Sequence, residues 1–139
     1  MNYLLDTNVV SEFRKKVPHA GAAGWIRSVR SSDLYLSVLV VGELRQGIER
    51  LAGRDQVQAM AIEEWTQRLV RGYGDRIIPV TVEVAETWGR LNARSLLPLV
   101  DGLMAATALA YDWTLVSRNT ADVARTGVRL LNPFELAAQ

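Results

Sequence analysis

The chain contains no cysteine and a single histidine, His19, among its 139 residues. Without thiols it can form neither disulfides nor thiolate metal sites, which is typical of proteins in a reducing compartment such as the cytoplasm. A single imidazole argues against a zinc site built from several histidines, and a Ser-His-Asp triad would have to use that one residue. Any metal site in this protein is therefore expected to rely on oxygen ligands.

Lysine is also scarce, and long apolar runs are absent. Only Lys15 and Lys16 are lysines among 16 basic residues. Arginine suits bidentate phosphate contact, although it also replaces lysine in some genomes. No apolar run reaches the ~18 residues of a membrane span, and no signal peptide is evident, so we expect a cytoplasmic protein without a membrane segment. A hydrophobic content of 49% can build the core of a single domain over residues 1–139.

Short strand-like segments alternate with longer helical ones along the chain. The predicted strands are residues 3–6, 34–37, 77–80, 114–117 and 128–131. The predicted helices are residues 7–14, 20–29, 38–51, 56–72, 82–94 and 99–111, with Thr81 as an N-cap and a helical turn at 121–125. This alternation predicts an α/β fold with a mainly parallel sheet covered on both faces. Ligands of such sheets bind beyond the carboxyl ends of the strands.

Asp6 and Asp101 each have a structural explanation as well as a functional one. Asp6 follows the first strand, where an aspartate commonly caps the next helix. Asp101 lies in a first helical turn after Pro98, where an acid complements the helix dipole. That helix is apolar on nearly all sides, so we expect it to be buried, and no cation lies between Arg94 and Arg118 to neutralise the carboxylate. The missing cation favours a bound ion at Asp101.

Glu43 and Asp122 also have two interpretations each. Glu43 lies on the helix after the second strand, where it could pair with Arg50 on an outer face. Gly47, one turn further on, would let another backbone approach closely. Asp122 follows the fourth predicted strand by one turn, in a segment whose Asn, Thr and Asp residues favour turns by themselves. Each of the four acids can be explained locally, but all four can project at one edge of a parallel sheet.

Carboxylates that cluster repel one another, and burial raises their pKa values. A hard divalent cation relieves both effects, and an oxygen-only ligand set suits Mg²⁺ or Mn²⁺. We therefore predict a metal site at this edge of the sheet. The predicted ligands are Asp6, Glu43, Asp101 and Asp122.

Four segments in this order resemble the PIN-domain family. They are LLDTNVVSE, SVLVVGELRQGIERL, VDGLMAATALAYDWTLVSRNTADV and GVRLLNPFE, and they cover most of the chain from Asn2 to Glu135. More narrowly, they resemble VapC-like toxins of bacterial type II toxin–antitoxin pairs, including the FitB-like branch. Val123 stands where the family often has Phe, and Gly102 stands where Ala is common. Neither departure removes a candidate ligand.

The resemblance implies an α/β/α sandwich and a Mg²⁺- or Mn²⁺-dependent endoribonuclease that hydrolyses RNA phosphodiester bonds. It also implies a homodimer and a cognate antitoxin bound over the active site. The family's site residues correspond to Asp6, Thr7, Glu43, Asp101, Asn119 and Asp122. We expect the three aspartates to hold metal directly or through water, while Glu43 completes the shell or orients the attacking water.

Two other functional classes share part of this pattern. Phosphoryl transfer through an aspartyl phosphate also begins with an Asp after a strand, but such sites require a lysine and none follows Lys16. The phosphatase pattern also requires a second Asp where Asn8 stands. A catalytically silent PIN-like module that binds RNA or protein is the alternative, although the four acids argue against it. The basic run from Arg14 to Lys16 is either a solvated turn or a phosphate contact.

Overall fold

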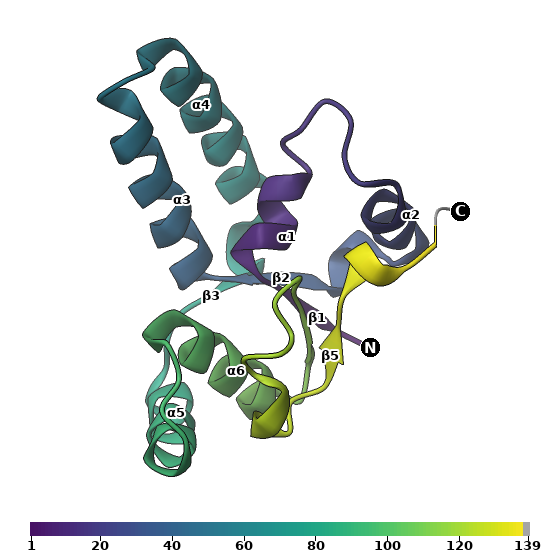
Figure 1. The fold of residues 1–139 in the computed structure, drawn as a ribbon, viewed down its shortest axis with the longest axis vertical. Coiled ribbons are helices and arrows are strands. Elements are labelled where there is room, and N and C mark those ends of the chain that lie inside the picture. Colours follow the sequence, from purple (N-terminus) through teal and green to yellow (C-terminus); the bar gives the residue numbers. More distant parts are fainter. Residues whose placement is uncertain (138–139) are drawn as a thin grey trace.

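The computed structural model describes residues 1–137, which form a sheet with helices on both faces (Figure 1). The five strands are all parallel and lie in the order β3-β2-β1-β4-β5. They are β1 (Tyr3–Leu5), β2 (Leu34–Ser37), β3 (Ile77–Ile78), β4 (Thr114–Val116) and β5 (Leu130–Leu131). The chain therefore builds the sheet outward from β1 in one direction and then returns to its other side, so the strand order reverses between β1 and β4.

Six α-helices connect and cover these strands. They are α1 (Thr7–Glu12), α2 (Ala20–Ser28), α3 (Val38–Ala52), α4 (Gln56–Tyr73), α5 (Val82–Arg94) and α6 (Leu99–Tyr111). Five of them begin at side chains that accept from free backbone N–H groups, namely Asp6 before α1, His19 before α2, Ser37 before α3, Asp55 before α4 and Thr81 before α5. The N-cap role predicted for Thr81 is thereby confirmed.

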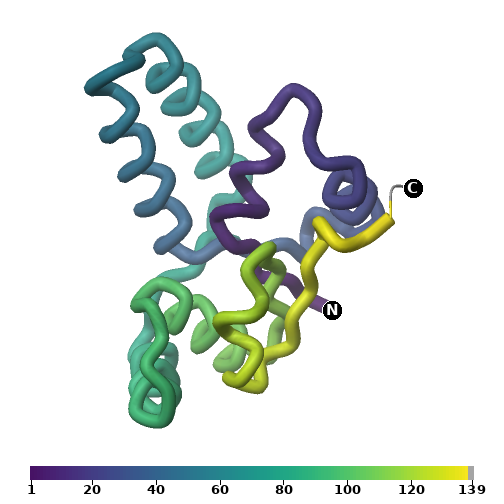
Figure 2. Tube along the Cα trace, viewed as in Figure 1, coloured from purple at the N-terminus to yellow at the C-terminus, as the bar shows by residue number. Residues whose placement is uncertain are grey.

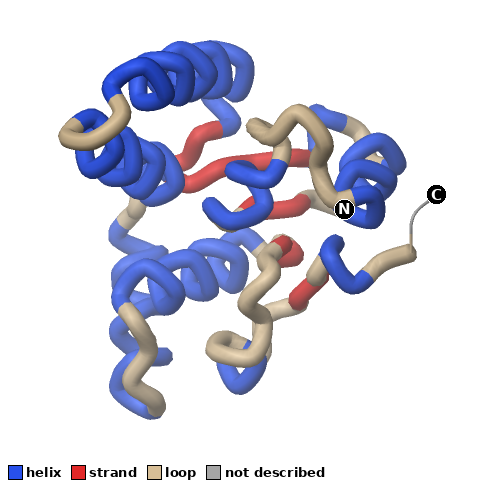
Figure 3. Tube along the Cα trace, turned by 45° about the horizontal axis from the view of Figure 1, so that its top comes forward, coloured by secondary structure: helices blue, strands red, loops and turns tan. Residues whose placement is uncertain are grey.

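The helices form two layers around the sheet. The strands lie between the α3–α4 pair and the α5–α6 pair, and α1 and α2 share the face covered by α3 and α4 (Figures 1 and 3). The C-terminal end of the described chain returns past α2, as the trace in Figure 2 shows. The predicted α/β/α sandwich with a parallel sheet is confirmed. No helix within residues 1–137 is long and apolar enough to cross a membrane.

The core lies on both sides of the sheet. Leu4, Leu36 and Val116 on the strands are fully buried, and Met104 and Ala108 of α6 pack against them. A parallel sheet covered on both faces requires such continuous apolar strands. Because the strands are parallel and their apolar residues end in this core, the polar residues that follow them lie together at the carboxyl edge of the sheet.

The predicted elements agree with the structure except at several ends. The helix predicted for residues 7–14 ends at Glu12, and β3 ends at Ile78 because Pro79 cannot donate to the sheet. The helical turn predicted at 121–125 is a turn followed by a 3-10 helix, Ala124–Thr126. The strand predicted at 128–131 is reduced to β5, which lies at an edge and pairs with β4 alone.

Candidate active site: the acidic edge of the sheet

Asp6 lies where the strand order reverses, at the carboxyl end of β1. Its backbone N–H donates to the Val116 carbonyl at 2.9 Å, which extends the pairing of β1 with β4. Its carboxylate accepts from the Thr7 backbone N–H at 2.8 Å and from the Ser117 hydroxyl at 2.8 Å. The capping explanation is therefore correct, yet the same carboxylate also reaches across to β4. Ligand sites of open parallel sheets lie at this reversal.

Glu43 is half-buried and points toward α1. The Thr7 hydroxyl donates to its carboxylate, which joins the first turn of α1 to the second turn of α3. No ion pair forms between Glu43 and Arg50. The outer-face interpretation of Glu43 is therefore wrong. Its side chain is held toward Asp6 because the helix after β2 starts at the same sheet edge as the helix after β1.

Asp101 lies in the first turn of α6 and connects the four acids electrostatically. Burial raises the pKa of its carboxyl, and the negative charges of Asp6, Asp122 and Glu43 raise that pKa further. The other three predicted acids are thus close enough to Asp101 to influence it. The expectation of a buried Asp101 is wrong in degree, because the side chain is only half-buried at the helix start, while the buried residues of α6 lie between Gly102 and Ala108.

Asp122 and Asn119 lie on the turn that follows β4. The Asn119 side-chain amide donates to the Asp122 carboxylate at 2.8 Å, and its backbone N–H donates to the Ser117 hydroxyl at 3.1 Å. Asn8 Oδ1 accepts from the Arg118 backbone N–H at 3.1 Å, so α1 fixes the same turn from the other side. The local turn explanation is therefore correct for Asp122. The same turn holds its exposed carboxylate near enough to Asp101 to affect it.

A cavity of about 390 Å³ opens at this edge. Its lining residues are Asp6, Thr7, Asn8, Glu43, Gln46, Gly47, Arg50 and Asp101. Asn119 and Asp122 are not among its lining residues. Ser117, Gln46 and Arg50 belong to the site although their sequence contexts do not predict it. A signal for Arg50 was present, because it lies two helical turns after Glu43 and so shares its face.

The donor chemistry of this edge suits a hard cation, since every candidate ligand is an oxygen. The Asp101 carboxylate has no hydrogen-bond or ion-pair partner among residues 1–137, and three like charges surround it. As the side chains stand, however, no three of them within the described residues converge closely enough to enclose an ion. Asp6, Glu43 and Asp122 are instead held by Ser117, Thr7 and Asn119.

This arrangement of acids is accompanied by a family match over most of the chain. A model of the PIN domain matches residues 3–128. The chain belongs to the PIN domain family. The match spans β1 through Val128, and so it includes all four acids and the strands that position them. The resemblance inferred from the four sequence segments is confirmed.

Individual PIN proteins resemble this chain over nearly their whole length. Plasmid stability protein StbB from Pseudomonas syringae pv. tomato is 30% identical over 95% of this chain and 98% of its own. VapC ribonuclease Y4jK from Sinorhizobium fredii is 29% identical over 96% and 99%. The crystal structure of FitAcB from Neisseria gonorrhoeae superposes with a TM-score of 0.86 at 29% identity, covering 96% and 99%. The narrower resemblance to the VapC- and FitB-like branch is thereby confirmed.

Proposed function

We propose that this PIN protein is a Mg²⁺- or Mn²⁺-dependent endoribonuclease that acts as the toxin of a toxin–antitoxin pair. The observation that supports this most directly is the gathering of acids around Asp101, whose pKa is raised by its burial and further by three acids from three separate segments. Such a convergence is costly for a fold and is typical of a functional site. The relatives named VapC ribonuclease and toxin FitB support the same activity.

Phosphodiester hydrolysis needs an activated water and neutralisation of charge on the phosphate oxygens, and a bound Mg²⁺ or Mn²⁺ supplies both. Asp6, Asp101 and Asp122 are the proposed ligands, with Glu43 as a further ligand or as the group that orients the water. Thr7, Ser117 and Asn119 have a positioning role, because each donates a hydrogen bond that fixes one of these carboxylates. One metal or two would suit the same oxygen set.

The proposed partners follow from the relatives. One relative is named toxin FitB, and the structure of FitAB bound to an IR36 DNA fragment is similar to this chain at 28% identity. We infer that this chain has a cognate antitoxin, forms a homodimer and acts in the cytoplasm. Expression of the chain alone should then slow growth, and coexpression of the neighbouring small gene should restore it. Normal growth with an active enzyme would remove the toxin role and leave the nuclease.

The enzymatic activity is tested with purified protein and total RNA in Mg²⁺, Mn²⁺ or EDTA. We expect cleavage in either metal, none in EDTA, and none from Asp101→Asn in any of the three. Glu86→Gln is the matched control, because Glu86 is exposed on α5 and lies outside the acidic cavity. Undiminished cleavage in EDTA would contradict the metal dependence. RNA binding by the wild type without cleavage in any metal would favour the alternative, a catalytically silent PIN-like module that binds RNA or protein.

A further inference from the structure

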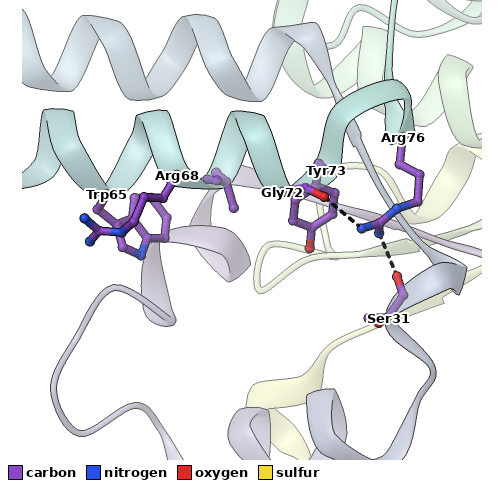
Figure 4. Close-up of a pocket in the computed structure, with 7 residues that line it drawn as sticks. Ser31, Trp65, Arg68, Gly72, Tyr73 and Arg76 are labelled. Atoms are coloured by element: carbon purple, nitrogen blue, oxygen red, sulfur yellow. Dashed lines mark hydrogen bonds between the residues drawn. The ribbon is translucent and has the colours of Figure 1, made fainter.

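The acidic cavity is one end of a row of cavities. A second cavity, between α1, α3 and α4, shares Thr7, Glu43 and Gly47 with the acidic one. A third cavity lies along α4 and shares Arg14 and Ile62 with the second. A fourth, drawn in Figure 4, lies at the carboxyl end of α4 and shares Trp65 and Arg68 with the third. Because neighbouring cavities share lining residues, they follow one another from Asp101 to Ser31, and this row of cavities is here called the α4 groove.

The α4 groove carries positive charge over its middle section. Its cationic lining residues are Arg14, Lys15, Lys16, Arg54 and Arg68, and Glu43 at the acidic end is the one carboxylate that lines the second and third cavities. Lys15 pairs with Glu12 at 2.9 Å. The other four cations have no carboxylate within 4.0 Å among residues 1–137. Their charge is therefore available to a bound molecule.

Arg76, at the far end of the groove, is different. Its guanidinium donates to the carbonyls of Ser31 and Gly72 (Figure 4). It also donates to the Leu34 carbonyl and lies over the Tyr73 ring. These contacts use the guanidinium donors of Arg76, which lines the end of the groove. The section able to bind an anion thus runs from Arg68 back to the acids, a path that passes the half-buried Trp65.

Gly47 lies at the junction between the acidic cavity and the cationic section. It is exposed in the middle of α3, and a Cβ at this position would meet no atom within 4 Å. A glycine in a helix interior costs about 1 kcal/mol relative to alanine, so this one destabilises α3 without any packing need within the chain. The missing side chain keeps the junction open.

We propose that the α4 groove is the path of a single RNA strand whose scissile phosphate lies at the acidic cavity. Arg14, Lys16, Arg54 and Arg68 contact its phosphates, Trp65 stacks on a base, and Gly47 provides room for the strand to enter. Proteins that bind single strands likewise combine a cationic groove with aromatic side chains on which bases stack. The proposal rests on the proposed RNA cleavage and adds the residues that position the substrate.

The first test measures binding apart from cleavage, in an Asp101→Asn background, with a short fluorescein-labelled single-stranded RNA. Arg14→Gln combined with Arg68→Gln removes two phosphate contacts. For single strands, log K falls by about 0.7 per phosphate contact for each tenfold rise in salt concentration. Loss of two contacts should therefore reduce the salt slope by about 1.4, and the affinity at 0.1 M salt, a tenfold step below 1 M, by about 25-fold. Arg27→Gln with Arg90→Gln, on exposed positions outside the groove, is the matched control and should change neither value.

The second test uses two glycines on the same helix. Gly47→Leu should leave the protein folded but block the strand, and so reduce both RNA binding and cleavage at least tenfold. Gly42→Leu is the control, because Gly42 is also exposed on α3 with no atom within 4 Å of a Cβ but lines neither the groove nor the acidic cavity. Equal circular dichroism spectra and melting temperatures would show that both variants are folded.

The outcomes separate the path from the activity. If the wild type cleaves RNA and the groove variants bind and cleave as their controls do, the path is wrong and the nuclease stands. If the wild type neither binds nor cleaves RNA, the proposed function fails and the path fails with it. Groove variants that lose a protein partner but keep full RNA affinity would show that the groove receives a protein segment, which would also overturn the proposal.

Discussion

Asp101 is the residue at which the competing demands of folding and function are most visible. It has no hydrogen-bond partner among the described residues, while burial and the charges of Asp6, Asp122 and Glu43 raise its pKa. Asp6, by contrast, gains a cap and a bond from Ser117. Two aspartates at the same edge therefore contribute to stability with opposite sign.

We predict that Asp101→Asn raises the melting temperature in EDTA at neutral pH. The folded wild type binds the Asp101 proton more tightly than the unfolded chain, whose pKa is near 3.8. Between that value and the raised pKa the native state holds more protons, so the free energy of unfolding falls as pH rises through this window. Asparagine does not titrate, so the variant lacks this pH-dependent loss of stability. The free energy of unfolding of the variant should equal that of the wild type below pH 3.8 and exceed it increasingly above that pH.

Thermal melts of both proteins over a pH series in EDTA measure this difference. Comparing the two proteins at each pH cancels other groups, such as Glu12, whose pKa is lowered mainly by the hydrogen bond from Lys15 and which loses its stabilising effect at low pH. A variant that is less stable than the wild type at neutral pH would show that Asp101 has a structural role.

Ser117→Ala tests the hydrogen bonds that hold the edge. The buried hydroxyl donates to Asp6 and accepts from the Asn119 backbone N–H. Removing it leaves both groups with one partner fewer, so we expect a loss of about 1–3 kcal/mol in the free energy of unfolding and slower RNA cleavage. Urea denaturation measures the first effect. Ser28→Ala, on an exposed helix end, should stay within about 0.5 kcal/mol of the wild type.

At the scale of elements, close packing explains one of the departures from the family pattern. A Cβ on Gly102 of α6 would lie 3.1 Å from the Trp88 ring of α5. The two helices pack against each other, so the wide indole on one requires the small residue on the other. The departure at Gly102 is thus matched within the chain. Val123, the other departure, is buried in the core.

Two glycine substitutions should change stability in opposite directions. A Cβ on Gly21 of α2 would overlap the Leu136 carbonyl oxygen, so Gly21→Ala must displace that backbone. We expect a loss of about 1–3 kcal/mol. Gly89 on α5 is exposed with no atom within 4 Å of a Cβ, and Gly89→Ala should gain up to about 1 kcal/mol from helix propensity. Chemical denaturation of both variants checks the signs, and a stable Gly21→Ala would refute the contact.

At the scale of the whole molecule, the acidic edge should couple metal binding to folding. Four acids from four segments approach one another only in the native state, so a cation that binds them stabilises that state alone. We predict that Mn²⁺ at 100 times its dissociation constant raises the free energy of unfolding by about 2.7 kcal/mol. Asp122→Asn should gain much less. Melts with Mn²⁺ or EDTA measure both, and equal gains would remove Asp122 from the site.

The amino-acid sequence by itself determined the succession of strands and helices along the chain and the positions of the acids within it. Those features follow from local patterns, since apolar runs, caps such as Thr81 and breaks such as Gly53 act over a few residues. They were sufficient to predict a parallel sheet with an acidic edge. Helix and strand ends were less well predicted, because pairing partners decide where β5 and the turn before it stop.

The tertiary structure alone decided which groups meet. The position of β1 between β2 and β4 brings Asp6 to Ser117, and α3 brings Glu43 to Thr7 across 36 residues of sequence. The half-exposure of Asp101 and the α4 groove also depend on how helices lie against one another. Periodicity in a sequence specifies which face of a helix is apolar, but strand order and helix placement depend on contacts between segments distant in the chain, which no local pattern contains.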